Sequence, residues 1–295
     1  MTRRDTNPDP RQPGSQPPFP QGEQAPPGSE ARMTPRPDYG EDTYRGRGLL
    51  QDRAAIITGG DSGIGRAVAL AFAREGADVL ISYLEEHEDA DETARAVRDA
   101  GRRAELVPGD IGSAEQCRSI VEAAMSAFGR IDILVNNAAF QMAHDHITKI
   151  PADEIERVFR TNILAMFWLT QAAVPHMGPG STIINTSSIQ AYDPSPELMH
   201  YAATKAAIAN FTKALSVQLI EQGIRVNAVA PGPVWTPLIA MSFDEEKIER
   251  FGENDPMGRP AQPAELAPAY VFLASDESRY VVGEMLGVTG GRFLP

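Results

Sequence analysis

The sequence has very little cysteine and no long apolar run. Cys117 is the one cysteine among 295 residues, so no disulfide can form within the chain, which is typical of a reducing compartment. The longest apolar runs, such as Ile163–Leu169, are far shorter than the ~18 residues that a membrane span needs. The Arg3–Arg4 pair is followed by polar residues and not by the apolar stretch of an export signal. These features predict a cytoplasmic protein with no membrane span.

Positive charge is also scarce. The chain carries 27 Lys and Arg against 40 Asp and Glu, which gives a formal net charge of −13. The first fifty residues contain seven side chains of each sign, so the whole excess of negative charge falls on residues 51–295. Such a surface repels phosphate groups, and this argues against nucleic acids and anionic membranes as partners.

Large aliphatic side chains are missing from the N-terminal segment. Residues 1–48 hold ten of the 24 prolines and six glycines, and apart from Met1 and Met33 they contain no large apolar aliphatic side chain. A segment of this composition cannot bury enough apolar area to offset the entropy lost on ordering. Two interpretations stay open, a solvated tail and an arm that lies on a partner subunit with Phe19, Tyr39 and Tyr44 as anchors. We therefore predict a Pro/Gly-rich extension over residues 1–48 and one domain over 49–295.

From Arg53 onward, short β-rich runs alternate with longer Ala-rich helical stretches. This alternation over about 240 residues predicts an α/β fold, with a single Rossmann-type doubly wound parallel sheet and helices on both faces. The expected strands are Ala54–Thr58, Asp78–Tyr83, Ala104–Pro108, Ile131–Asn136, Thr182–Thr186, Ile224–Ala230 and Glu284–Val288. The expected helical stretches include Ile64–Glu75, Ala90–Ala100, Ala114–Phe128 and one long stretch over 155–177.

The first expected strand runs into a glycine-rich loop, Gly59-Gly60-Asp61-Ser62-Gly63-Ile64-Gly65, and then into a helix. Glycine lets the backbone come close to a pyrophosphate, and the start of the helix supplies free N–H groups and a positive dipole end. The spacing is Gly-x3-Gly-x-Gly. A loop of this kind alone also fits a tight turn, but the strand before it and the helix after it favour dinucleotide binding.

Three more loops follow expected strands, at the sheet edge where ligands bind in such folds. Asp110-Ile111 follows the third strand, and Asp110 is placed to accept a hydrogen bond from an adenine amino group. Asn136-Asn137-Ala138-Ala139 follows the fourth strand, and its small side chains leave room for a ribose or a base. Pro231-Gly232-Pro233-Val234-Trp235-Thr236 follows the sixth strand.

A set of polar residues in the second half of the chain carries a family resemblance. Tyr201 and Lys205 are four residues apart in a helical stretch and share a face. Ser188 precedes Tyr201 by thirteen residues, and Asn162 lies in the long helical stretch. These residues occur together with Thr58-Gly59-x3-Gly63-Ile64-Gly65, Asn136-Asn137-Ala138 and Pro231-Gly232. Their order and spacing resemble the short-chain dehydrogenase/reductase family over residues 50–295. The resemblance points in particular to the bacterial general-stress-type oxidoreductases of the glucose/ribitol dehydrogenase-like branch, although Ala139 stands where the family usually has glycine.

The resemblance implies an NAD(P)-dependent oxidoreductase that transfers a hydride between a nicotinamide cofactor and an alcohol or carbonyl compound, such as a sugar or a small aldehyde or ketone. Tyr201 then exchanges a proton with the substrate oxygen, and Lys205 lowers the pKa of that phenol and holds the nicotinamide ribose. Ser188 donates a hydrogen bond to the substrate oxygen, and Asn162 holds a water that links Lys205 to solvent. The alternative is a dinucleotide-sensing binding protein with little turnover.

The expected cofactor is NADP or NAD, with a preference for NADP. No carboxylate stands near the end of the second strand before Glu85 to bind a ribose 2′-hydroxyl, Ser82 suits either cofactor, and Arg66 is the local cation for a 2′-phosphate. The positions expected to contact the cofactor are Gly59, Asp61, Ser62, Gly63, Ile64, Gly65, Ser82, Tyr83, Asp110, Ile111, Asn137, Ala138, Ala139, Tyr201, Lys205, Pro231, Gly232, Val234 and Thr236.

Four further expectations concern metal, assembly, the segment Pro237–Asn254 and the extension. His144-Asp145-His146 lies in an expected loop without other clustered ligands, so no metal site is predicted. A homo-oligomer, either a dimer or a tetramer, is implied by the family and by apolar side chains such as Phe167, Trp168, Phe211 and Leu215. Pro237–Asn254 is expected to form a mobile lid or a surface helical hairpin. Because residues 1–45 contain none of the site residues, their deletion is expected to leave cofactor binding intact but to weaken assembly or lower thermal stability.

Overall fold

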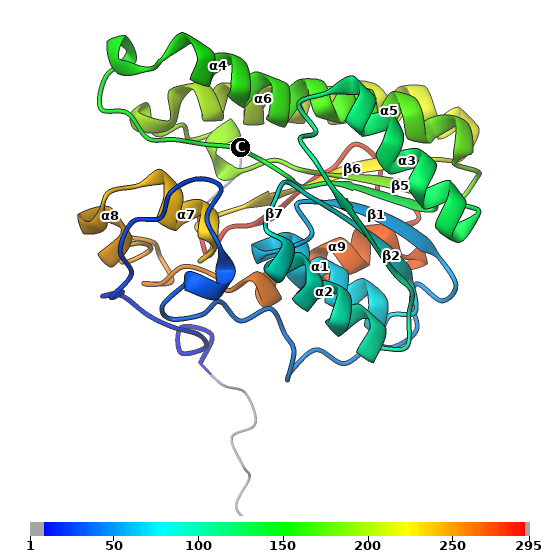
Figure 1. Cartoon of the computed structure of the whole chain (residues 1–295), viewed down its shortest axis with the longest axis horizontal. Helices are drawn as coiled ribbons and strands as arrows, with labels where there is room; N and C mark the ends of the chain where they lie inside the picture. Colours follow the sequence, from blue (N-terminus) through cyan, green and yellow to red (C-terminus); the bar gives the residue numbers. More distant parts are fainter. Residues whose placement is uncertain (1–8, 293–295) are drawn as a thin grey trace, which may run out of the picture.

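The computed structural model describes residues 9–292, and the Arg3–Arg4 pair lies outside this range. Seven strands form one sheet in the order β3-β2-β1-β4-β5-β6-β7, and every neighbouring pair is parallel (Figure 1). This confirms the predicted parallel sheet. The strands are β1 (Ala54–Thr58), β2 (Asp78–Tyr83), β3 (Ala104–Pro108), β4 (Ile133–Asn136), β5 (Thr182–Thr186), β6 (Arg225–Pro231) and β7 (Met285–Val288).

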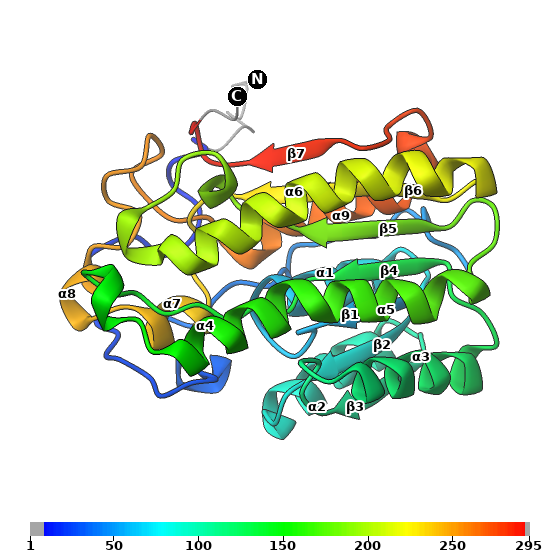
Figure 2. The same ribbon diagram turned by 90° about the horizontal axis from the view of Figure 1, so that it is seen from above.

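Helices cover both faces of the sheet, as predicted. One face carries α1 (Gly63–Arg74), α2 (His87–Asp99) and α9 (Pro263–Ala274), and the opposite face carries α3 (Ala114–Phe128), α5 (Ala165–Ala173) and α6 (Met199–Leu219) (Figures 1 and 2). Every residue of β1, an interior strand of the sheet, is buried.

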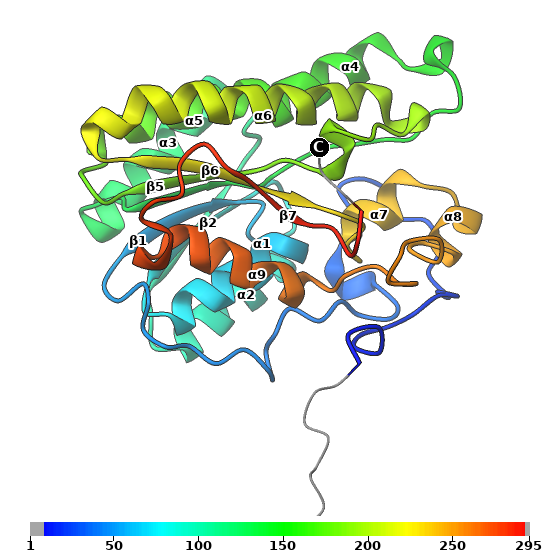
Figure 3. The ribbon, with the colours of Figure 1, turned by 180° about the vertical axis from the view of Figure 1, so that it is seen from behind.

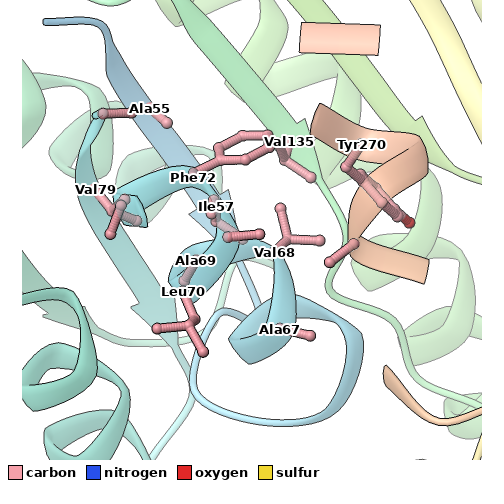
Figure 4. Packing of buried hydrophobic residues seen from close by; sticks show 14 of the residues in the cluster. Ala55, Ile57, Ala67, Val68, Ala69, Leu70, Phe72, Val79, Val135 and Tyr270 are labelled. Carbon is pink, nitrogen blue, oxygen red and sulfur yellow. The ribbon is translucent and has the colours of Figure 1, made fainter. Parts of the chain in front are cut away.

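Alternate side chains of β1 enter different cores because side chains along a strand point to opposite faces. Ala55 and Ile57 pack in the cluster that contains α1 and α9, where Val68, Phe72 and Tyr270 surround them (Figure 4). Ile56 packs in the other cluster, with residues of α3 and α5. The uninterrupted apolar run of this strand therefore reflects burial on both faces.

The expected helical stretch over 155–177 is divided into several elements. It begins with α4 (Ala152–Phe159), passes through a π-helical turn, η3 (Arg160–Leu164), and continues as α5 and a short 3-10 turn, η4 (Val174–His176). Asn162 lies inside the π turn. A π turn adds a residue to the helix, which re-aims the side chains around it, and such turns are frequent at functional sites.

The described part of the N-terminal extension, residues 9–48, packs on its own chain, so its interpretation as a solvated tail is wrong around Phe19, Tyr39 and Tyr44. Contact with a partner subunit stays a prediction. Phe19 is buried and stacks on Trp235 with ring centroids 4.0 Å apart. Tyr39 and Tyr44 pack against the same cluster as α1 and α9. The anchors are those that the sequence predicted, but the apolar surface they need is supplied by the rest of the same chain.

The extension runs beside the segment that was expected to be a lid (Figures 1 and 3). That segment forms α7 (Pro237–Ser242) and α8 (Glu245–Glu249). Backbone hydrogen bonds join the two: Phe19 N donates to Glu249 O at 2.8 Å, and Gln24 N donates to Ala240 O at 2.9 Å. Among residues 9–292, no helix combines the length and the apolarity that crossing a bilayer requires.

Candidate active site

A cleft of about 310 Å³ runs along the edge of the sheet where the parallel strands end. The loops that follow β1 to β6 line it, in agreement with the rule that ligands bind at this edge. Ser188 and every expected cofactor contact except Gly65 lie on its wall. The structure therefore brings together in one cleft residues that are up to 177 positions apart, from Gly59 to Thr236.

The glycine-rich loop is shaped by backbone conformations that glycine favours. Gly59 and Gly63 have φ angles of +60° and +51°, in the left-handed region. Gly65 does not line the cleft. A Cβ at Gly65 would lie 1.8 Å from the Gly59 carbonyl oxygen, so its missing side chain lets α1 pack directly on the loop.

The ends of β1 and β4 are joined by side-chain hydrogen bonds at the point where the strand order reverses. Thr58 Oγ1 accepts from the backbone N–H groups of Asn137 and Ala138, at 3.0 and 3.1 Å. Asn137 Nδ2 donates in turn to the carbonyl oxygens of Thr58 and Gly59, at 3.1 and 3.2 Å. Asn137 thus holds the glycine-rich loop in place, a role that the sequence alone did not indicate.

Tyr201, Lys205 and Ser188 form one wall of the cleft. Tyr201 and Lys205 lie one turn apart on α6, and Lys205 Nζ is 5.2 Å from the centre of the Tyr201 ring. Lys205 Nζ also donates to Thr186 O at 2.8 Å. Ser188 forms a hydrogen bond with Tyr201. The neighbouring Ser187 instead donates to Lys205 O at 3.0 Å, so its hydroxyl supports the helix.

Burial controls the ionisation of this wall. It raises the pKa of Tyr201, and the hydrogen bond with Ser188 opposes that rise. Burial also lowers the pKa of Lys205 to about 7. Burial thus shifts both groups toward their neutral forms in the protein alone. Burial, and not Lys205, sets the pKa of Tyr201 in the protein without cofactor, which the sequence did not reveal.

Asn162 lies behind this wall and does not line the main cleft. Its Oδ1 accepts from Phe140 N at 2.8 Å, and its Nδ2 donates to Phe140 O at 3.0 Å and to Thr204 Oγ1 at 3.1 Å. The side chain therefore ties the loop after β4 to α6. Asn162 and Thr186 both line a small second cavity beside the cleft.

The prediction that Arg66 faces a 2′-phosphate is wrong. Arg66 is completely buried and forms ion pairs with Glu30 at 2.7 Å and Asp89 at 3.2 Å. Its partner Glu30 belongs to the N-terminal extension. No pattern in the sequence indicated that the extension reaches this site. At the end of β2, the Ser82 hydroxyl lies on the cleft wall and has no hydrogen-bond partner among the described residues.

The sequence analysis missed several residues of the cleft wall. Pro27 and Gly28 of the extension line it, as does Arg157, whose guanidinium lies 4.0 Å from the centre of the Phe140 ring. The periodicity of α4 marks Arg157 only as a surface position. The extension residues carry no recognisable signal, because their place depends on packing between distant segments.

His144 has neighbours that the sequence did not suggest. Glu154 Oε1 lies 2.7 Å from His144 Nε2 and 3.0 Å from His200 Nε2, so these side chains form a cluster of groups that can bind metals. His146 is not part of it and interacts with Thr148. Hydrogen bonds between the Glu154 carboxylate and the His144 and His200 rings account for the cluster. Because His200 directly precedes Tyr201, these bonds fix the start of α6.

Comparison with known proteins identifies the family. The family described as Enoyl-(Acyl carrier protein) reductase matches residues 59–292. General stress protein 39 of Bacillus subtilis is 49% identical over 268 residues, which cover 91% of this chain and 94% of that protein. The Glucose and ribitol dehydrogenase homolog of Oryza sativa subsp. japonica is 50% identical over 288 residues, covering 92% and 96%. The chain belongs to the short-chain dehydrogenase/reductase family.

A solved structure supports this assignment. The short chain dehydrogenase from Burkholderia cenocepacia J2315 in complex with NADP superposes with a TM-score of 0.77 at 32% identity, covering 82% of this chain and 98% of that one. The predicted resemblance is confirmed, and this short-chain dehydrogenase/reductase is an NAD(P)-dependent oxidoreductase.

The residues present fit a nicotinamide dinucleotide. Glycine at position 59 lets the glycine-rich loop pack closely on the loop after β4, since a Cβ there would lie 3.0 Å from Ala138 Cα. The buried Ser82 hydroxyl, which has no partner within residues 9–292, offers a hydrogen-bonding group at the end of β2. Lys205 places a buried amine on the part of the cleft wall that Tyr201 and Ser188 form. Glycines at one end and a Tyr–Lys pair at the other are what an extended dinucleotide and its substrate require.

Proposed function

We propose that this oxidoreductase interconverts an alcohol and a carbonyl compound, such as a sugar or a small aldehyde or ketone, and that Asn162, Ser188, Tyr201 and Lys205 form its catalytic group. One observation carries the proposal. The Tyr201–Ser188–Lys205 wall and the glycine-rich loop belong to the same cleft, so a dinucleotide bound at the loop can reach a substrate held at Tyr201.

The bound dinucleotide supplies the hydride chemistry, and the side chains of the wall manage the proton. During reduction, the Tyr201 hydroxyl donates its proton to the carbonyl oxygen, and during oxidation the phenolate takes the proton of the alcohol. Ser188 donates a hydrogen bond to the oxygen on which negative charge develops. Lys205 holds the nicotinamide ribose and, when charged, favours the phenolate.

Asn162 supports the group from behind. Its side chain fixes the Phe140 backbone, and it shares the second cavity with Thr186, whose carbonyl oxygen accepts from Lys205. This arrangement supports a water relay from Lys205 toward solvent, with Asn162 as the residue that positions the water.

Both NADP(H) and NAD(H) are proposed as cofactors, with a modest preference for NADP(H). The relative from Burkholderia cenocepacia is in complex with NADP. The wall around Ser82 contains Asp61 and Glu86 and, among the described residues, no Lys or Arg, because Arg66 is occupied by its ion pairs. Since discrimination then rests on hydrogen bonding by Ser82, we expect both cofactors to support turnover.

We further propose a cytoplasmic homo-oligomer, a dimer or a tetramer, in which residues 49–295 form the catalytic domain and 1–48 the extension. Apolar side chains on the outer faces of α4, α5 and α6 support assembly. Phe159, Phe167 and Val217 are 39%, 44% and 73% exposed, and such a row of apolar side chains marks an interaction surface.

The test measures binding and turnover separately. Titration of the full chain with NADPH or NADH gives the Kd, and oxidation of each cofactor is then followed against a panel of aldehydes, ketones and sugars. We expect micromolar binding and carbonyl-dependent oxidation. Binding without turnover across the panel would favour the dinucleotide-sensing alternative, and no binding of either cofactor would contradict the proposed function.

A further inference from the structure

We infer that the N-terminal extension is part of the dinucleotide site and that Glu30 is a positioning residue for the glycine-rich loop. The inference rests on the proposed function, because it concerns the binding of the same cofactor. It assigns a role in binding to a segment that lies before the family match, which begins at residue 59.

The carboxylate of Glu30 contacts the loop directly. Glu30 is completely buried, its Oε2 accepts from Gly63 N at 2.6 Å, and its Oε1 lies 2.7 Å from Arg66 Nη1. Gly63 is the first residue of α1, where backbone N–H groups have no partner within the helix. Glu30 therefore provides the cap that α1 lacks in its own sequence, since the Ser62 side chain makes no such bond.

The same network holds the other side of the loop. Arg66 Nε and Thr93 Oγ1 both donate to Asp61 O, at 2.8 and 2.9 Å. The backbone on either side of Ser62 is thus fixed, at Asp61 by Arg66 and at Gly63 by Glu30. Arg66 forms ion pairs with Asp89 and Glu92 as well as with Glu30. Loss of Glu30 would therefore remove one of three carboxylates that orient the guanidinium bound to Asp61 O.

The extension is itself fixed in the position that this contact requires. Glu30 N and Ala31 N donate to the carboxylate of Asp89 at 2.9 and 3.2 Å. Just before this point, Pro27 and Gly28 line the cleft. Gly28 has a φ of +77°, and a Cβ there would lie 3.0 Å from Pro237 O. The extension therefore forms one side of the cleft mouth against the start of α7.

A loop with several glycines loses much conformational freedom when it is ordered. The contacts of Glu30, Arg66 and Thr93 order the glycine-rich loop before the cofactor binds. Binding then costs less conformational entropy, and the affinity for the cofactor is higher. By thermodynamic linkage, the cofactor must then stabilise the extension by the same factor. This inference replaces the expectation that deletion of residues 1–45 leaves cofactor binding intact.

The test uses Glu30→Ala and Glu30→Gln in the full chain, with Glu23→Ala as the matched control. Glu23 is an exposed carboxylate of the same extension. We expect Glu30→Ala to raise the Kd for NADPH about tenfold or more, which corresponds to the loss of one charge-assisted hydrogen bond. Glu30→Gln keeps the side-chain volume and an acceptor for Gly63, so it should raise the Kd by a smaller factor, about threefold. The control should leave the Kd unchanged.

Two measurements distinguish a role of Glu30 in positioning the glycine-rich loop from a general destabilisation of the protein. The kcat at saturating NADPH and the KM of the carbonyl substrate should stay within about twofold of the wild type in Glu30→Gln. In the wild type, NADPH should slow hydrogen exchange in residues 20–36, and it should do so less in Glu30→Gln. An unchanged Kd in Glu30→Gln, or equal protection of residues 20–36 in the two proteins, would overturn the inference. If the wild type itself did not bind NADPH, the proposed function would fail instead.

Discussion

Burial sets the ionisation of the two helix residues at the centre of the cleft. Tyr201 and Lys205 are 7% and 2% exposed, and the low polarity around them disfavours a phenolate and an ammonium alike. The pKa of Lys205 falls to about 7 from an ordinary value of 10.5. A lysine with this pKa changes its charge near neutral pH, where a proton relay has to work.

The lowered pKa of Lys205 predicts how stability depends on pH. Between about pH 7 and pH 10.5 the unfolded chain binds a proton at this amine that the folded protein does not bind. The free energy of unfolding of the protein without cofactor should therefore rise with pH across this window. We expect this rise to be larger in the wild type than in Lys205→Met, which has no titrating amine.

Urea denaturation at about pH 7.5 and about pH 9.5 gives the four free energies needed. Other titrating groups contribute equally to both proteins, so the difference between the two slopes isolates Lys205. Equal slopes would mean that Lys205 keeps an ordinary pKa in the folded protein.

The side chain at position 82 is expected to influence the choice between NADP(H) and NAD(H). We expect Ser82→Asp to shift the preference toward NAD(H), because a carboxylate repels a 2′-phosphate and accepts hydrogen bonds from a 2′-hydroxyl. The ratio of the kcat/KM values for NADPH and NADH should fall at least about tenfold. Ser119→Asp, which adds the same charge at an exposed position of α3, is the control. An unchanged ratio in Ser82→Asp would place the adenosine ribose elsewhere.

At the scale of secondary-structure elements, the π turn η3 joins two parts of the site. Its Asn162 holds both backbone groups of Phe140 and contacts Thr204 on α6. The turn therefore couples the loop after β4, which borders the cleft, to the helix that carries Tyr201. A regular helix through this region would aim the same side chain in another direction.

Removal of this side chain should weaken both the fold and the site. Asn162→Ala leaves the buried N–H and C=O groups of Phe140 without partners, which costs on the order of 1–3 kcal/mol for each group. We expect a lower urea midpoint with an unchanged m-value and a reduced kcat. Asn254→Ala, at an exposed asparagine, should match the wild type. Wild-type stability in Asn162→Ala would show that the Phe140 backbone has other partners.

The sequence predicted elements well where local pattern determines them. The alternation of buried runs with Ala-rich stretches identified all seven strands, and the spacing from Ser188 to Tyr201 and Lys205 placed these residues on one wall. The π turn was not predictable because it depends on Asn162 meeting Phe140 from another loop. Arg66 was misinterpreted for the same kind of reason, since its partner Glu30 lies 36 residues earlier in a segment without a recognisable pattern.

At the scale of the whole molecule, composition misled the interpretation of the extension. A segment poor in aliphatic residues does not form a core of its own, but here the missing apolar surface comes from the α7–α8 region. Phe19 and Met33 share a cluster with Trp235, Ile239 and Ile248. The extension therefore connects α7 and α8 to the glycine-rich loop.

The exposed apolar face of α5 and α6 predicts how copies of the chain associate. Phe167 and Phe211 contact each other with ring centroids 4.4 Å apart on this face. A buried carboxylate at an interface is costly, so Phe167→Asp should shift the protein toward monomers while leaving it folded. Size-exclusion chromatography with light scattering measures the mass, and Tyr280→Asp, at a fully exposed aromatic residue outside α5 and α6 in the sequence, is the control. An unchanged mass in Phe167→Asp would place the interface elsewhere.

The proton-transfer role of Tyr201 is the central claim, and a single-turnover measurement on Tyr201→Phe tests it most directly. The enzyme is mixed with saturating NADPH and an active carbonyl substrate, and oxidation of the cofactor is followed in time. Phenylalanine keeps the ring and removes only the hydroxyl, so we expect the rate to fall about 10²–10⁴-fold, as for loss of a general acid. The Kd for NADPH should change by no more than about threefold. A variant that retains more than about a third of the wild-type rate would contradict this account of the active site.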